Sequence, residues 1–242
     1  MAENYFVVNL KARKEIAEST MEFRFEKPKG FEFIAGQHVL VTLINPKETD
    51  AEGNRRVFCL ASAPYEEDLI VACRMRDTAF KREFGTMKIG SEVELRGPYG
   101  SMTLDKTQGK PAVFLAGGIG ITPFRSIILD ATARRLAGEL SLFYSNYRPE
   151  DAAYISELRG IEKENKNYTF IPTMTEMKKS KMTWNGERGY ISKEMLAKYV
   201  EDLKLPVYYI TGPPLMVLSM QAVLLEMGVA PDSIETEQFI GY

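Results

Sequence analysis

The amino-acid sequence predicts two domains, a small antiparallel β-barrel followed by an α/β domain with an open parallel sheet. Up to about residue 105, short apolar-rich segments alternate with turn signals, a pattern typical of small β-barrels. After residues 109–111, apolar runs alternate with helical patterns, which indicates βαβ units. We therefore expect a barrel domain over residues 1–106 and a Rossmann-like domain over residues 107–242.

Turn signals such as Pro28-Lys29-Gly30 and Gly97-Pro98 separate the strands expected in the first domain. Met21 to Phe25 alternates apolar and charged residues, as a half-buried strand does. A short helix is expected near Ala79 to Met87. The expected strands are Phe6 to Leu10, Met21 to Phe25, His38 to Ile44, Val57 to Ala61, Leu69 to Arg74 and Val93 to Arg96.

In the second domain, Ala112 to Ala116 is an unbroken apolar run, as expected for a parallel strand buried on both faces. Weaker strand signals alternate with helical patterns, so the connections should be right-handed crossovers. The further strands are Leu140 to Tyr144, Tyr168 to Ile171 and Val207 to Ile210, and the helices are Pro123 to Ala137, Glu150 to Glu164 and Leu215 to Met227.

Composition excludes several classes of protein. The net charge of −2 argues against non-specific nucleic-acid binding. Cys59 and Cys73 are the only cysteines, too few to hold an iron-sulfur cluster or to form a disulfide framework. His38 is the only histidine; it falls at an expected strand start, and we interpret it as structural. We therefore expect no metal site.

The first residues, Met1 to Asn4, show no basic segment followed by an apolar one, as a secretory signal would. No apolar run approaches the length of about 18 residues that a membrane-spanning helix needs. We therefore expect a cytoplasmic protein without a membrane span.

The most informative segment covers residues 114–123, where a buried strand ends in glycines and leads into a helix. Gly117, Gly118 and Gly120 would let the backbone approach a pyrophosphate, and the helix start offers free amides. Thr122 is expected at the N-cap and Pro123 at the first helical position. The last glycine of the dinucleotide fingerprint is missing, so a turn that serves only packing is the alternative.

The end of the next strand bears on the choice of nucleotide. An NAD-selective site would carry an acidic residue here to hold the ribose 2′-hydroxyl, and none is present. Ser145 and Arg148 would instead tolerate or bind a 2′-phosphate. This favours NADPH over NADH, although Arg148 could equally be a solvated residue before the following helix.

Five motifs in order along nearly the whole chain resemble those of the ferredoxin-NADP reductase family of flavoproteins. The resemblance is carried by Arg56-Val57-Phe58-Cys59, Gly97-Pro98-Tyr99-Gly100, Gly117 to Pro123, Gly212-Pro213-Pro214-Leu215-Met216 and the final Glu237 to Tyr242. It implies FAD bound by the barrel, and NADPH or NADH bound by the second domain.

The resemblance also implies roles for individual residues on the flavin side. Arg56 would pair with the flavin pyrophosphate, and Phe58 would pack against the isoalloxazine ring. Arg74, Phe80 and Lys81 resemble segments that hold the FAD phosphates and adenine. The segment containing Phe80 and Lys81 could otherwise be only a capped helix start.

On the nicotinamide side, Gly212, Pro213 and Met216 resemble the segment beside the nicotinamide. An aromatic residue near the chain end would cover the second flavin face. Phe239 and Tyr242 both fit that role, and the sequence does not choose between them.

Two residues depart from the family pattern near the reacting atoms. Cys59 replaces the serine that donates a hydrogen bond near flavin N5, and a thiol is a weaker donor. Thr211 stands where many members have a cysteine that positions nicotinamide. Glu237 remains as a proton-handling carboxylate, with a purely structural pairing as the alternative.

The function implied by the resemblance is hydride transfer from NAD(P)H to FAD, followed by single-electron transfer to a separate carrier such as ferredoxin or flavodoxin. The alternatives are the reductase component of an oxygenase, or a reductase of free flavin or cytochrome. The departures at Cys59 and Thr211 leave a non-catalytic flavin- or nucleotide-binding regulator as a further alternative.

Overall fold

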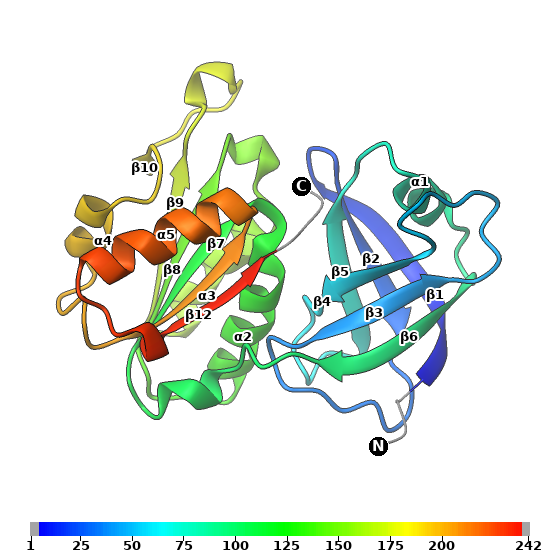
Figure 1. Cartoon of the computed structure of the whole chain (residues 1–242), viewed down its shortest axis with the longest axis horizontal. Helices are drawn as coiled ribbons and strands as arrows, with labels where there is room; N and C mark the ends of the chain where they lie inside the picture. The colour runs from blue at the N-terminus through cyan, green and yellow to red at the C-terminus, as the bar shows by residue number, and fades with distance from the viewer. Residues whose placement is uncertain (1–4, 239–242) are drawn as a thin grey trace.

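The computed structural model describes residues 5–238 and divides them into two sheets of six strands each, placed side by side (Figure 1). The first sheet is antiparallel, and the second is parallel with helices on both faces. This confirms the predicted fold class. The expected boundary between residues 106 and 107 falls within the short 3₁₀ helix η1 (Leu104–Thr107), which connects the two sheets.

The first sheet curls into a barrel because its two edge strands come together. The amide of Ala61, just beyond β4, donates to the carbonyl of Ile70 in β5 at 2.7 Å. Phenylalanines fill the interior; the rings of Phe23 and Phe84 stack 3.9 Å apart. The elements are β1 (Tyr5–Ala17), β2 (Thr20–Glu26), β3 (His38–Leu43), β4 (Arg55–Cys59), β5 (Asp68–Arg74), α1 (Ala79–Thr86) and β6 (Glu92–Tyr99), in the strand order β4-β3-β6-β1-β2-β5.

The parallel sheet is buried on both faces, as the apolar run in β7 predicted. Alternate residues of β7 face opposite layers: Phe114 packs toward α2 and α3, and Leu115 toward α4 and α5. The strands are β7 (Ala112–Gly117), β8 (Leu140–Asn146), β9 (Tyr168–Met174), β10 (Glu187–Arg188), β11 (Val207–Gly212) and β12 (Ile234–Gln238), in the order β10-β9-β8-β7-β11-β12. The helices are α2 (Ile121–Ala133), α3 (Ile155–Glu164), α4 (Lys193–Tyr199) and α5 (Pro214–Glu226), with 3₁₀ turns η2 (Gly118–Gly120), η3 (Pro149–Asp151), η4 (Met177–Lys179) and η5 (Pro231–Ser233).

Two strands and one helix of the second domain, β10, β12 and α4, were not expected from the sequence. Helix α4 is short, and it begins where the Ser192 hydroxyl accepts a hydrogen bond from the Met195 amide. Strand β12 reads Ile-Glu-Thr-Glu-Gln, which has no apolar alternation, because it lies at the sheet edge with only Ile234 fully covered. In the barrel, β1 continues well past the expected Leu10 through charged residues that pair with β2 by backbone bonds and by the Lys14–Glu22 ion pair.

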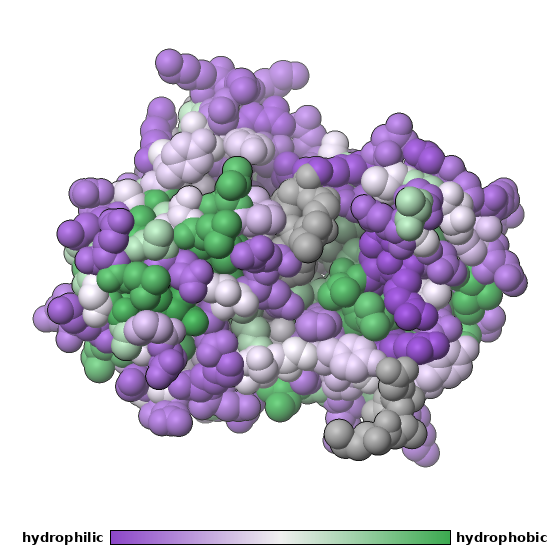
Figure 2. Space-filling model, in the orientation of Figure 1, coloured by the Kyte–Doolittle hydropathy of each residue, from purple (hydrophilic) through white to green (hydrophobic). Residues whose placement is uncertain are grey.

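Hydrophobic residues gather on the surface along α5 (Figure 2). Leu215, Leu218 and Leu225 are 80%, 53% and 43% exposed, and their spacing puts them on one face of the helix. The opposite face, with Val217 and Leu224, packs on the sheet. Over residues 5–238, no helix is both long enough and apolar enough to cross a membrane.

Candidate functional site

The glycine turn after β7 lies against the end of β11. A Cβ atom on Gly120 would lie 2.7 Å from the Thr211 carbonyl oxygen, so only glycine permits this approach. The Thr211 hydroxyl donates to the Gly120 carbonyl and is completely buried. The structure therefore assigns Thr211 to holding the turn. The expected role of its hydroxyl beside nicotinamide stays a prediction, and the bond to Gly120 argues against it.

The start of α2 differs from the sequence prediction. Helix α2 begins at Ile121 with Gly120 as its N-cap, so Thr122 is not the cap and Pro123 is not the first helical residue. The Thr122 hydroxyl instead donates to the Ile119 carbonyl at 3.1 Å. The helix starts earlier because η2 runs directly into it, and Pro123 is tolerated since an amide in the first turn has no intrahelical partner.

A cavity of about 500 Å³ lies at the carboxyl ends of the parallel strands, the usual binding position in open α/β sheets and a volume suited to a small ligand. Its wall contains expected nucleotide-binding residues from three segments, together with two arginines of the barrel domain. These lining residues are Gly117, Gly118, Ser145, Pro213, Met216, Arg74 and Arg76. Gly212 lies behind this wall, where a Cβ atom on it would come within 3.1 Å of the Gly117 backbone.

Several polar atoms beside this cavity lack a hydrogen-bond partner within the described part of the chain, residues 5–238. They are the buried Nε of Arg74 and both amide atoms of Asn146, which is 5% exposed. Buried polar groups are normally satisfied, so a ligand rich in phosphate and hydroxyl oxygens fits this site. Arg74, expected on the flavin side, lines this cavity, and its Nη2 also donates to the Asp151 carbonyl at 3.3 Å; its role toward FAD stays a prediction.

Arg148 does not line the cavity. Its guanidinium binds both carboxylate oxygens of Asp151 at 2.9 Å and reaches Glu18 of the barrel domain at 3.0 Å. The carboxylates of Asp151 and Glu18 thus neutralise the guanidinium, and they raise the pKa of Arg148 above its ordinary value. Of the two residues that favoured NADPH, Ser145 lines the cavity and Arg148 does not. The argument for NADPH that rested on Arg148 therefore loses its basis.

On the barrel, Arg56 is held by the acidic loop before β4. Its Nη2 lies 3.1 Å from Asp50 and 3.0 Å from Glu52, and its Nη1 donates to the carbonyls of Glu52 and Gly53. Burial raises the pKa of Asp50, but the hydrogen bond from Arg56 and those from two backbone amides lower it by more. The net result is a pKa below the ordinary value of an aspartate. A phosphate would therefore compete with these carboxylates for Arg56.

Phe58 and Phe80 belong to the barrel core. The ring of Phe58 lies 5.5 Å from that of Phe84 and 6.0 Å from that of Phe80, and the residue is 6% exposed. The surface left for stacking on a flavin ring is therefore small. Phe80 is covered from outside by the Arg56 guanidinium at 5.0 Å. Lys81 lies in the first turn of α1, and burial lowers its pKa.

Cys59, Glu237 and His38 meet where the two domains join. The Cys59 thiol donates to Glu237 Oε2 at 3.5 Å, and His38 Nδ1 lies 3.1 Å from Glu237 Oε1. Burial raises the pKa of Cys59 well above its usual value, and the Glu237 carboxylate raises it further, so the thiol stays protonated. The expected catalytic residues Cys59 and Glu237 are thus adjacent.

His38 was interpreted from sequence as structural, and its contact with Glu237 makes that interpretation incomplete. His38 and Cys59 are directly opposite in the β3–β4 pair, so their side chains share one face. A Cβ on Gly100, whose φ is +95°, would lie 2.8 Å from His38 Nδ1, so glycine leaves room for the ring. The Gly97 to Gly100 motif was the available signal for this residue.

Phe239 and Tyr242, the candidates for covering the flavin, lie outside the described residues, and their role stays a prediction. Among residues 5–238, no group of three or more His, Cys, Asp or Glu side chains is arranged to hold a metal ion.

Known proteins resemble this chain in sequence. Residues 114–222 match the oxidoreductase NAD-binding domain family. The phenol hydroxylase P5 protein of Acinetobacter pittii is 28% identical over 237 residues, covering 94% of this chain and 63% of that protein. One component of the Na(+)-translocating NADH-quinone reductase of Pasteurella multocida is 28% identical over 160 residues, 64% of this chain and 39% of its own length. This chain thus spans less than two thirds of the length of either relative.

Solved structures extend the match to both domains. The ferredoxin NADP+ reductase of Neisseria gonorrhoeae, with bound FAD and NADP, superposes with a TM-score of 0.81 at 22% identity, covering 97% of this chain and 98% of that one. The chain has the fold of the ferredoxin-NADP reductase-like oxidoreductases. The cytochrome P450 reductase GcoB of Amycolatopsis has the same fold, with a TM-score of 0.83 at 22% identity over 98% of this chain and 70% of that one. The two-domain fold that the motifs implied is therefore confirmed.

The acidic loop yields a test of the flavin site. Asp50→Asn should tighten FAD binding about two- to fivefold, since it removes a partly exposed ion pair that competes for Arg56. A fluorescence titration of the apoprotein with FAD measures this. Asp50 is protonated only below its ordinary value of 3.8, so the variant and the parent should differ at neutral pH and converge in stronger acid.

Glu48→Gln is the matched control, because Glu48 lies in the same loop but pairs with Arg82. Its FAD affinity should equal that of the parent. Unchanged or weaker FAD binding in Asp50→Asn would show that Arg56 does not take the flavin phosphate.

Proposed function

We propose that this chain is a flavin-dependent oxidoreductase that passes a hydride from a nicotinamide nucleotide to FAD and then single electrons to a separate carrier. The observation that carries the proposal is the 3.5 Å contact between Cys59 and Glu237. Cys59 ends the flavin motif of the barrel, and Glu237 lies on the edge strand next to β11, whose end packs on the nucleotide turn. The two expected cofactor sites therefore share one junction.

The residues present fit the two cofactors. Unpartnered polar atoms and a glycine-lined wall suit a dinucleotide at the cavity. On the barrel, Arg56, Lys81 and the start of α1 supply positive charge for a pyrophosphate. FAD, when bound, supplies the conversion between two-electron and one-electron transfer. Ser145 and Arg74 suit either nucleotide, so we include NADH and NADPH alike.

The protein's own residues orient the reactants and handle protons. Arg74 and Asn146 would bind nucleotide oxygens, and the glycine turn would admit the pyrophosphate close to the backbone. The Cys59 thiol stays protonated and donates toward Glu237. Glu237, between that thiol and the His38 ring, is placed to accept or return a proton at its carboxylate oxygens.

The electron carrier is proposed to be a separate ferredoxin or flavodoxin. Both cysteines of these 242 residues are free and buried, so no cluster held by four cysteines lies within this chain. The free thiols also suit a reducing compartment, and we place the reaction in the cytoplasm.

A second candidate is the reductase component of an oxygenase. It is favoured by the alignment with the phenol hydroxylase P5 protein, which runs over 94% of this chain. Strong activity with an oxygenase and none with ferredoxin or flavodoxin would select it, and turnover with free flavin alone would select a flavin reductase.

Anaerobic mixing tests the hydride step. The FAD-loaded protein should lose its flavin absorbance near 450 nm, roughly in proportion to the nucleotide added, with NADH or NADPH. Stopped-flow absorbance measures the rate, and addition of ferredoxin or flavodoxin should restore the oxidised spectrum. If neither nucleotide bleaches the flavin, the chain is not a nicotinamide-dependent reductase.

Glu237→Gln tests the proton-handling role. Loss of a general acid–base typically costs about 10²-fold or more, so carrier reduction should slow by about that factor and lose its solvent deuterium isotope effect. Glu235→Gln is the control, since Glu235 lies on the same side of β12 but pairs with Lys106 at 2.6 Å. Equal rates and isotope effects in the two variants would remove Glu237 from the mechanism.

A further inference from the structure

Arg125 on α2 is a buried cation at the junction of the two domains. Its side chain is only 4% exposed. It binds both carboxylate oxygens of Glu157 at 2.8 and 2.6 Å, those of Glu66 at 2.9 and 3.3 Å, and the Ala61 carbonyl at 2.6 Å. These five contacts use the full donor set of a guanidinium.

The partners of Arg125 come from both domains. Glu157 lies on α3 of the second domain, whereas Ala61 and Glu66 belong to the segment that connects β4 to β5 in the barrel. The next residue on α2 repeats the connection, because the Ser126 hydroxyl donates to the Ser62 carbonyl at 2.6 Å. This network therefore joins the segment next to Cys59 to the helix next to the glycine turn.

The hydrogen bonds of Arg125 are directional, so they fix how the two domains are oriented. Apolar side chains of similar volume could stabilise a buried junction as well as this ion network does, but they would permit sliding. A bidentate guanidinium–carboxylate pair together with a backbone carbonyl fixes distance and orientation together. Burial alone would lower the pKa of Arg125, but the two carboxylates raise it well above its ordinary value, so the charge persists.

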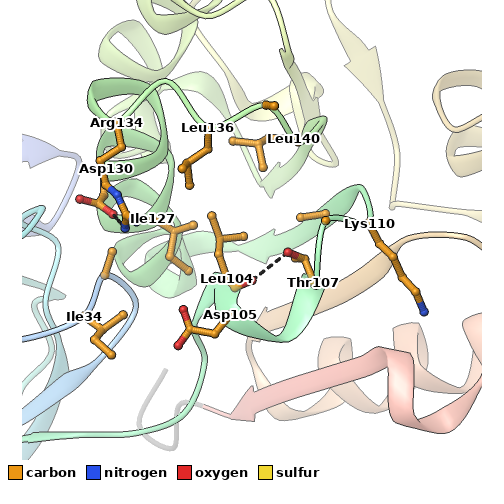
Figure 3. A pocket seen from close by; sticks show the side chains of 15 residues that line it. Ile34, Leu104, Asp105, Thr107, Lys110, Ile127, Asp130, Arg134, Leu136 and Leu140 are labelled. Atoms are coloured by element: carbon orange, nitrogen blue, oxygen red, sulfur yellow. Dashed lines mark hydrogen bonds and ion pairs between the residues drawn. The ribbon is translucent and has the colours of Figure 1, made fainter.

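Further along α2, the contact between the domains is hollow. A cavity of about 380 Å³ separates Ile127 and Arg134 from Ile34 and from Leu104 of the connecting segment (Figure 3). Side chains that face a void lose the packing contacts that would resist movement. The polar network around Arg125 thus holds the domains on this side of the junction, and Arg148–Glu18 and Arg74–Asp151 add further polar contacts between them.

We propose that Arg125 is a positioning residue that sets the distance between the flavin site on the barrel and the nucleotide site on the parallel sheet. The inference rests on the proposed function, because the distance matters only if hydride crosses it. Arg125 itself reaches neither expected cofactor site. It acts through the backbone at Ala61 and through the start of α2.

The test compares Arg125→Lys and Glu157→Gln with Arg134→Gln. Lysine keeps the charge but cannot bind two carboxylates and a carbonyl in one plane. Glu157→Gln is the milder variant. Glu157 is partly exposed, and glutamine has nearly the same shape, so the substitution removes the charge without leaving a cavity. Among the residues that the structure describes, the Arg134 side chain pairs only with Asp130 on the same helix, so it serves as the control.

In anaerobic stopped flow at saturating nucleotide, Arg125→Lys should lower the limiting rate of flavin reduction roughly 10- to 100-fold, the cost of a misplacement of about 1 Å. The nucleotide Kd should change less than about twofold, and 4-deuterated nucleotide should give a larger isotope effect than in the parent. Glu157→Gln should show a smaller loss of the same kind. Unchanged limiting rates, or a loss confined to Kd, would overturn the proposal.

Amide hydrogen exchange of the FAD-loaded protein gives a readout that does not depend on activity. Exchange over residues 61–66 and the first turn of α2 should quicken in Arg125→Lys but not in Arg134→Gln. If the parent is not reduced by either nucleotide yet these amides exchange faster, the proposed function fails and the structural link stands. Equal exchange in the parent and in both arginine variants would contradict the link itself.

Discussion

Two neighbouring backbone carbonyls, those of Ala61 and Ser62, connect the two halves of this molecule. They accept hydrogen bonds of 2.6 Å from Arg125 and Ser126, consecutive residues of α2. Because the first carbonyl lies two residues beyond Cys59 and α2 begins at the glycine turn, this contact fixes the flavin motif relative to the nucleotide turn. The remaining features of the site depend on that placement.

The Cys59–Glu237–His38 group shows this dependence. Antiparallel pairing puts His38 and Cys59 on one face of the barrel, and parallel pairing puts Glu237 opposite Thr211 at the end of the other sheet. Neither register alone brings the carboxylate to the thiol. The contact forms only because the two sheets are held side by side, so the group is a property of the interface between the domains.

The sequence predicted most of the fold, since its strongest signals are local. The apolar run of β7 and the glycines after it require a buried strand followed by a close turn, and both were found. Strand β12 was missed because an edge strand with one fully covered side chain leaves no alternation to read. Its position next to β11 is decided by tertiary packing.

The site was predicted less completely, because its partners are distant along the chain. The sequence indicated Arg148 as a phosphate ligand, but in the structure it donates a hydrogen bond to Glu18, 130 residues earlier in the chain. Arg125 lay in an expected helix, with nothing in the sequence to mark Glu66, 59 residues away, as its partner. Pairings of this kind follow from how the domains meet, and no local pattern encodes them.

The most direct test is a crystal structure of the protein with FAD and a non-reducible nicotinamide analogue. The nicotinamide ring should enter between the Gly117–Gly212 contact and the Cys59–Glu237 pair. Its C4 should lie about 3–3.5 Å from flavin N5, the separation that hydride transfer requires. A nicotinamide held away from this junction, or a flavin bound on a different face of the barrel, would contradict the account.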